Sequence, residues 1–307
     1  AVKLSLLPGA VAVPQQVNLT MFASSGHYVA LGCTSYDATA SAPDYLGSYD
    51  PLLIRWANVD PTIGPEPEVW QPTVTNTAGF LRLQSGSRII AAVNSRQEML
   101  IFTDTSITAM QFLGTTEVFG LQELADNISI ISPRSTTTVN NVTYWMGLDK
   151  FYAYSGRVET LPCTLRNHVF QNLNYDQADQ IVSGTNEGWH EVWWFYPTAD
   201  SLTNNAYVVY NYLEKIWHYG YIERTAWLDS PLRQYPLGVG NNYVYNHEYG
   251  TDADGTAMQS YIISSDFDIT DGDQFILMRR IIPDMSFSGS TANNPVAYVT
   301  VKPRNFP

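Results

Sequence analysis

The chain has 307 residues, 45% hydrophobic and 15% charged, and its 29 acidic residues against 16 basic ones give a net charge of -13. This composition excludes a disordered chain and supplies enough apolar surface for a large packed core. The acidic balance argues against tight nucleic-acid binding, because a surface that grips phosphates needs clustered Lys and Arg.

Residue usage favours strands over helices. Aromatic residues make up 13% of the chain, with 20 Tyr and 8 Trp, and such residues are enriched in sheets. We therefore expect an all-β protein. The two cysteines, Cys33 and Cys163, are far apart and are expected to be free thiols. No apolar run reaches the roughly 20 residues of a membrane helix, so we expect no membrane insertion by this segment.

The first third of the chain is the least regular. Residues 1–24 are apolar and punctuated by proline, and we interpret them as a covering segment or as a strand lent to a neighbour. Residues 27–33 and 52–56 read as strands, separated by a loop rich in Ser, Asp and Tyr. A proline-rich loop then ends at residues 69–70.

Strand-turn-strand units follow one another along the rest of the chain. Residues 165–180 are an exception, since Val169, Leu173 and Gln177 have helical spacing, and the pattern is equally compatible with a short helix and with an irregular segment. The expected strands are 98–102 and 107–113, 143–147 and 151–154, 192–196 with 207–212 and 216–219, and 235–240 with 243–247.

The spacing of these units indicates the architecture. Taking Val29, Leu100, Tyr144, Trp193 and Leu237 as markers, the intervals are 71, 44, 49 and 44 residues. A period of about 45 residues is typical of β-propeller blades, and a β-sandwich with similar strand spacing is the alternative. The regular aromatic strands and tight Asp or Asn turns favour the propeller. We predict a β-propeller over residues 25–260 and an attached β-sandwich-like platform over residues 261–307.

No candidate for catalysis or metal binding stands out. Asp252 and Asp254 resemble the start of a calcium loop, but Ile263 stands where the loop needs Glu, so a plain turn is favoured. His190 and His247 each precede a Glu without the second His of a zinc helix. The acidic cluster of Asp266, Asp268, Asp271 and Asp273 reads as a solvated turn. We therefore expect no enzyme, no cofactor and no metal site.

Long strings of residues, in order over nearly the whole chain, carry a family resemblance. They are DPLLIRWANVDP (50–61), TNTAGFLRLQSGS (75–87), EMLIFTDTSITAMQFLG (98–114), YWMGLDKFYAYSGRVETLPCTLRNHVF (144–170), EVWWFYPTADS (191–201), YVVYNYLEKIWHYG (207–220), SSDFDITDGDQF (264–275) and RRIIPDM (279–285). They resemble the tail nozzle proteins of short-tailed bacteriophages, also described as packaged-DNA stabilisation proteins or tail tubular protein B-like proteins.

The resemblance implies a structural role in the virion. It implies a propeller with a β platform, six copies in a ring below the portal and adaptor, and a channel that retains packaged DNA and conducts it during ejection. The expected partners are further copies of the chain, the portal and adaptor, the tail fibre proteins, and double-stranded DNA that passes without specific binding. The resemblance also implies that this chain is the central part of a longer protein.

An alternative function is a carbohydrate-binding or carbohydrate-active propeller in a receptor-binding tail protein. Trp193, Trp194 and Trp217 in one surface cleft with two carboxylates would favour sugar, and their burial between blades would favour the structural role.

Arg279 and Arg280 are the candidate interface residues. They lie side by side in an apolar run expected as a strand over residues 275–282, so they would point to opposite faces. One could then pair within its own sheet while the other reaches a neighbouring copy or the adaptor. Two ordinary solvated edge residues are the alternative.

Overall fold

The computed structural model describes residues 7–250, 252–253, 256–257, 261, 263, 277–288, 290 and 293–302. The chain forms two compact units, Ala1–Gly250 and Thr251–Pro307. Within the described residues, no helix has the length and apolar character needed to cross a membrane.

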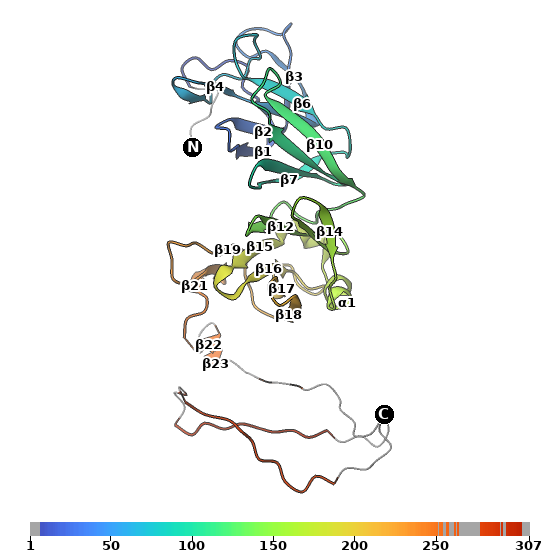
Figure 1. Ribbon diagram of the computed structural model, residues 1–307, viewed down its shortest axis with the longest axis vertical. Helices are drawn as coiled ribbons and strands as arrows, with labels where there is room; N and C mark the ends of the chain where they lie inside the picture. Colours follow the sequence, from blue (N-terminus) through green and yellow to red (C-terminus); the bar gives the residue numbers. More distant parts are fainter. Residues whose placement is uncertain are drawn as a thin grey trace. The chain divides into compact units, whose positions relative to one another are not determined.

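The described residues of the first unit form five antiparallel sheets of three or four strands, which follow one another in chain order (Figure 1). We name them sheets I to V. Sheet I comprises β1 (Val17–Phe22), β2 (Tyr28–Tyr36), β3 (Leu46–Trp56) and β6 (Gly79–Arg82). Sheet II comprises β7 (Ile89–Asn94), β8 (Glu98–Thr103), β9 (Ser106–Phe112) and β10 (Phe119–Asp126). Sheet III comprises β11 (Thr136–Val139), β12 (Val142–Met146), β13 (Phe151–Tyr154) and β14 (Val158–Leu161).

The two remaining sheets continue the pattern. Sheet IV comprises β15 (Val182–Asn186), β16 (Glu191–Tyr196), β17 (Ala206–Asn211) and β18 (Ile216–Gly220). Sheet V comprises β19 (Ala226–Leu228), β20 (Leu237–Gly240) and β21 (Tyr243–Asn246). Two-stranded ladders are formed by β4 (Asn58–Asp60) with β5 (Gly64–Glu66) and by β22 (Asp252–Ala253) with β23 (Thr256–Ala257). The helical elements are α1 (Arg166–Gln171) and the 3-10 turns η2 (Tyr175–Gln180) and η3 (Glu187–Trp189).

The sheets are meanders whose first strands contact one another in sequence. In sheets II to V the hydrogen-bonded strand order equals the chain order. The first strand of each sheet contacts the first strand of the next, from β1 to β7, β11, β15 and β19. Successive small sheets that meet through their first strands are the blades of a β-propeller-like fold. The propeller prediction is therefore confirmed, and the five marker residues all lie in the second strand of their sheets.

Alternate side chains of each second strand enter different cores. Along β12, Tyr144 and Met146 pack with sheet IV while Trp145 packs with sheet II. Along β16, Trp194 packs with sheet III and Trp193 packs toward β19. Sheets III and IV thus bury both faces against neighbouring sheets, which explains why β12 and β16 read as continuous apolar runs.

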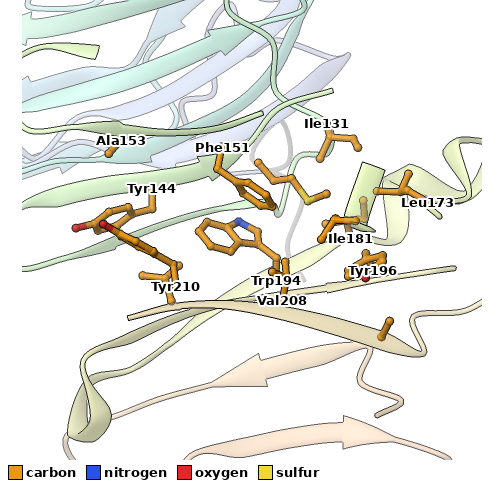
Figure 2. Packing of buried hydrophobic residues seen from close by; sticks show 14 of the residues in the cluster. Ile131, Tyr144, Phe151, Ala153, Leu173, Ile181, Trp194, Tyr196, Val208 and Tyr210 are labelled. Atoms are coloured by element: carbon orange, nitrogen blue, oxygen red, sulfur yellow. The ribbon is translucent and has the colours of Figure 1, made fainter. Parts of the chain in front are cut away.

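The core between sheets III and IV shows how this packing works. The indole of Trp194 is fully buried, and its ring centre lies 5.0 Å from that of Phe151 across the interface (Figure 2). Its Nε1 donates a hydrogen bond to the Ser135 carbonyl at 2.9 Å. The interface is therefore rich in aromatic side chains, and the buried N–H of the Trp194 indole has a hydrogen-bond acceptor.

Tight asparagine turns set the length of two hairpins. Asn140 and Asn141 join β11 to β12, and Asn241 and Asn242 join β20 to β21. All four have positive φ, between 48° and 64°. Consecutive left-handed residues form the two-residue turn that matches the twist of a hairpin, and Asn tolerates this conformation well.

Residues 1–24, interpreted from the sequence as a covering segment or as a strand lent to a neighbour, contain both kinds of structure in their described part. Val17–Phe22 pairs with β2 as the first strand of sheet I, so the sheet begins before residue 25. Only the residues ahead of it, such as Ala12 and Val13, cover the outer face of sheet I, together with Trp70. The alternating burial of β1 explains the strand, because every second side chain packs inward.

The segment with helical spacing is only partly helical. Its helix, α1, ends at Gln171, and Leu173 forms an isolated bridge to Thr198 before η2 begins. Val169 and Leu173 are both buried, as the spacing indicates. The Asn174 side chain accepts from the Asp176 N–H, which starts a new turn and interrupts a continuous helix.

In its described ranges the second unit differs from the strands predicted from residue 261 onward. Within it, the described ranges 277–288 and 293–302 carry no strand, and their side chains are exposed. The acidic residues 266–273 lie outside the described residues. An apolar alternating run can form a strand only when a partner supplies the ladder hydrogen bonds, and the pattern alone does not specify that partner.

Candidate functional site

The three tryptophans singled out by the sequence serve in packing. Trp193 and Trp194 are buried on opposite faces of β16. Trp217 is half-buried, packs against Phe151 and donates from its Nε1 to the Pro162 carbonyl at 2.8 Å. All three pack in the cores between blades and not together in one surface cleft.

A cavity of about 460 Å³ lies instead at one end of sheets IV and V. One wall is the η3 turn, which joins β15 to β16, and the other is the loop 229–236, which joins β19 to β20. Glu248, just beyond β21, also lines it. We name this space the blade-end pocket, after the ends of the two blades that form it. Its polar and aromatic lining residues include Asn186, Glu187, Trp189, Asp229, Arg233, Tyr235 and Glu248.

Hydrogen bonds tie the two walls of the blade-end pocket together. The Glu187 N–H donates to Asp229 Oδ2 at 2.8 Å, and the buried Asn186 amide donates to Glu248 Oε1 at 3.2 Å. Beneath them, Trp227 Nε1 donates to the Thr185 carbonyl at 2.7 Å. The pocket is thus formed before any ligand enters.

The lining combines an exposed aromatic ring with carboxylates. Trp189 is 60% exposed although its backbone carbonyl accepts a hydrogen bond from Asn211 Nδ2 at 3.1 Å. Glu187, Asp229 and Glu248 contribute three carboxylates against the one guanidinium of Arg233, so the lining is net negative. An aromatic surface with hydrogen-bond acceptors around it can bind a ligand that has one apolar face and polar edges.

Two titratable groups beside the pocket, the partly buried Glu191 and the more exposed His218, are partly shielded from solvent. Burial raises the pKa of Glu191, opposed by the hydrogen bond that Trp193 Nε1 donates to it at 2.9 Å and reinforced by the charge of Glu248. Burial lowers the pKa of His218, whose Nε2 lies 3.9 Å from Glu191 Oε1. That distance is too long for a hydrogen bond, and loss of hydration dominates both groups, so they do not form a strong ion pair.

The histidine–glutamate pairs take other roles. His190 is exposed at a left-handed position that ends the η3 turn, and His247 accepts a hydrogen bond from Arg224 Nε at 2.7 Å. Across the described residues, no group of three or more His, Cys, Asp or Glu side chains could hold a metal ion. The loop at Asp252 and Asp254 is only partly described, so the calcium-loop alternative stays untested.

Both cysteines are free, as predicted. Burial raises the pKa of the Cys33 thiol to about 12 and that of Cys163 to about 11. Because the thiolate is the reactive form, neither side chain is suited to act as a nucleophile at neutral pH.

Arg279 and Arg280 are exposed within the described range 277–288. Residues 277–282, the described part of the strand expected over 275–282, do not form a strand. The alternation of a strand therefore does not place the side chains of Arg279 and Arg280 on opposite faces. Their exposure leaves them accessible to a partner, and the interface role stays a prediction.

The sequence does not predict the residues of the blade-end pocket. Trp189, Asp229 and Glu248 come from three connections that are distant in sequence, and each alone looks like an ordinary turn residue. The signal available in the sequence is the tryptophan in a turn, because an indole can supply a stacking surface for a ligand.

A scan against protein-family models and a search of curated proteins found no match. Solved structures that match include Hsv2 from K. marxianus, 8% identical with a TM-score of 0.40 over 74% of this chain and 61% of that one. The extracellular domain of a one-component system from B. thetaiotaomicron is 11% identical, with a TM-score of 0.40 over 80% of this chain and 33% of that one. The N-terminal domain of Nup159 is 12% identical, with a TM-score of 0.38 over 80% of this chain and 78% of that one. The chain therefore spans less than two thirds of the first two, and similarity at this level carries no argument about function.

Proposed function

We propose that the chain is a structural component of a phage tail, forming a ring below the portal and adaptor that retains packaged DNA and conducts it during ejection. The observation that carries this proposal is the ordered set of sequence strings that resemble tail nozzle proteins. These strings coincide with structural units, since residues 98–114 cover β8 and β9 and residues 144–170 cover most of sheet III and α1. The structural comparisons add no argument for or against it.

The packing of the blades supports a mechanical role. Aromatic and aliphatic side chains join sheets I and II, II and III, III and IV, and sheet IV with β19. A series of blades that share their cores resists deformation, because displacing one blade opens two interfaces. Such rigidity suits a conduit that holds DNA under pressure.

The charge balance supports passage of DNA without tight binding. With a net charge of -13 the chain repels phosphates at long range, whereas a basic lumen would bind DNA and slow its movement. In this proposal the protein has no catalytic role and needs no cofactor, and it acts within the virion.

Assembly and DNA binding test the proposal together. We expect the purified chain, mixed with its natural tail partners, to form a ring of six copies. We also expect the chain to bind duplex DNA only weakly at physiological salt. Tight DNA binding that weakens steeply as salt is raised would contradict the conduit role.

The lack of catalysis is tested separately. Incubation with host polysaccharide or peptidoglycan should release no product. Reproducible hydrolysis that is lost on replacing one carboxylate would overturn the structural proposal in favour of the enzymatic alternative.

A further inference from the structure

Three features of the blade-end pocket need an explanation that a purely structural role does not give. The pocket is large, at about 460 Å³, which lies within the range of small-molecule sites. Its walls are fixed by the hydrogen bonds from Glu187 to Asp229 and from Asn186 to Glu248. A large apolar ring, that of Trp189, is left exposed at its edge, where burial between blades would have been more stable.

The chemistry of the lining selects among ligands. The excess of carboxylates disfavours phosphates and acidic sugars, because the nearby negative charges repel them. The polar lining disfavours a wholly apolar ligand, which would leave the acids without partners. A saccharide fits both features, since its ring has an apolar C–H face that can stack on an indole and hydroxyl groups at its edge that donate to carboxylates.

We propose that the blade-end pocket binds a neutral saccharide, with Trp189 as the stacking surface and Asp229, Glu187 and Glu248 as hydrogen-bond acceptors. Asp229 Oδ2 is held by the Glu187 N–H, so the carboxylate is oriented before the sugar arrives. Arg233 supplies donors from the opposite loop. This is a binding activity in addition to the structural role, and it does not depend on ring formation.

The full chain can be tested on an array of neutral, amino-substituted and acidic oligosaccharides, followed by titration of each neutral oligosaccharide that binds. We expect binding to neutral members and none to acidic ones. We also expect little change in affinity between low and physiological salt, because a neutral ligand carries no charge to be screened.

Two matched variants locate the site. Trp189→Ala removes the stacking surface at an exposed position and is expected to weaken binding by about tenfold or more. Tyr221→Ala removes another exposed aromatic side chain, 63% exposed and outside the lining, and should bind as the wild type does. Circular dichroism of both variants checks that the fold is retained.

Other outcomes would overturn the saccharide proposal. They are the absence of binding to every neutral oligosaccharide on the array, and binding that Trp189→Ala leaves unchanged. Spermidine, a cation, is tested in the same way. If spermidine binds, if salt strongly weakens that binding, and if no neutral glycan binds, the saccharide proposal is overturned. The pocket would then be assigned to cations, which an indole and three carboxylates attract. Because Trp189→Ala should not alter ring formation, failure of this proposal and failure of the tail role are separate results.

Discussion

Arg55 shows how a single buried charge fastens the start of the chain to sheet I. Its guanidinium is fully buried and donates to the carbonyls of Thr34 at 3.0 Å, Ala12 at 2.6 Å and Trp70 at 3.1 Å. Burial lowers its pKa to about 10, so it stays charged at neutral pH. These bonds hold the segments at Ala12 and Trp70, which lie outside the ladders of sheet I, against β2 and β3.

Replacing Arg55 should therefore unfold this region. Arg55→Ala leaves three buried carbonyls without donors and is expected to lower the free energy of unfolding by roughly 3 to 5 kcal/mol. Chemical denaturation measures the change. Arg82→Ala is the control, because Arg82 pairs with Asp50 at the surface and its loss should cost about 1 kcal/mol or less. Equal effects of the two variants would refute the anchoring role of Arg55.

His27 gives the stability of the protein a dependence on pH. Its side chain is buried and lies between Ser25 Oγ, 2.9 Å from Nδ1, and Thr77 Oγ1, 3.3 Å from Nε2. Burial lowers its pKa, and a hydrogen bond with the Ser25 backbone offsets this in part. The unfolded chain, with a His pKa near 6.5, therefore takes up a proton at a higher pH than the folded chain does.

Stability should accordingly be complete above pH 6.5 and fall as the pH is lowered from there toward the folded-state pKa. The slope for this one proton is at most about 1.4 kcal/mol per pH unit. Denaturation of the wild type and of His27→Gln between pH 6.5 and pH 5 should show a shallower loss in the variant. His190→Asn, at an exposed left-handed position, should keep the wild-type slope. An unchanged slope in His27→Gln would show that this histidine is not the source.

At the scale of strands, Gly184 permits the close approach of sheets IV and V. A Cβ at this position would lie 2.1 Å from Cδ1 of Trp227, whose ring stacks on Trp193 at 5.3 Å between centres. Gly184→Ala should displace the indole and lower the free energy of unfolding by about 1 to 3 kcal/mol. Gly188→Ala is the matched control, since the nearest atom to its Cβ is 3.9 Å away. A stable Gly184→Ala variant would mean that the two sheets do not pack as described.

The interface between sheets III and IV can be tested by a double-mutant cycle. Phe151→Leu and Trp194→Phe should show a coupling energy of about 0.5 to 1.5 kcal/mol, because their rings are in contact. Phe102→Leu with Trp194→Phe should be additive within about 0.5 kcal/mol, since Phe102 lies in the core between sheets II and III. Additivity of the first pair would contradict face-to-face packing of the blades.

The strands could be predicted from the sequence because their signals are local. Leu100, Tyr144 and Trp193 mark apolar runs between turn residues, and the run length and turn chemistry determine each hairpin. Their regular spacing then indicated repeated blades. For residues 1–24 the sequence leaves a covering segment and a strand as alternatives, and pairing with β2 identifies residues 17–22 as the strand.

The candidate site could not be predicted because its parts meet only in the folded chain. Trp189 and Asp229 belong to connections of different blades, and the sequence does not indicate which loops become neighbours. From the sequence, Trp193, Trp194 and Trp217 are candidates for a site, because the sequence does not show which side chains become buried. Trp193 and Trp194 are adjacent in sequence, but strand geometry sends them to opposite cores.

At the scale of the whole molecule, Arg279 and Arg280 are the residues through which assembly can be tested. Arg279→Glu and Arg280→Glu, made separately, should leave the circular dichroism spectrum unchanged, because both side chains are exposed. If one of them contacts a neighbouring copy or the adaptor, its reversal should reduce incorporation into tails. Normal tail assembly by both variants would defeat the interface role and leave the propeller itself untouched.

The most direct test of the account is to image virion tails by electron cryomicroscopy with an antibody fragment bound to the propeller. If the chain forms the proposed ring, six fragments should appear directly below the portal and adaptor, around a channel that contains DNA before ejection. Fragments on the capsid or on the fibres alone, or tails without any fragment, would contradict it.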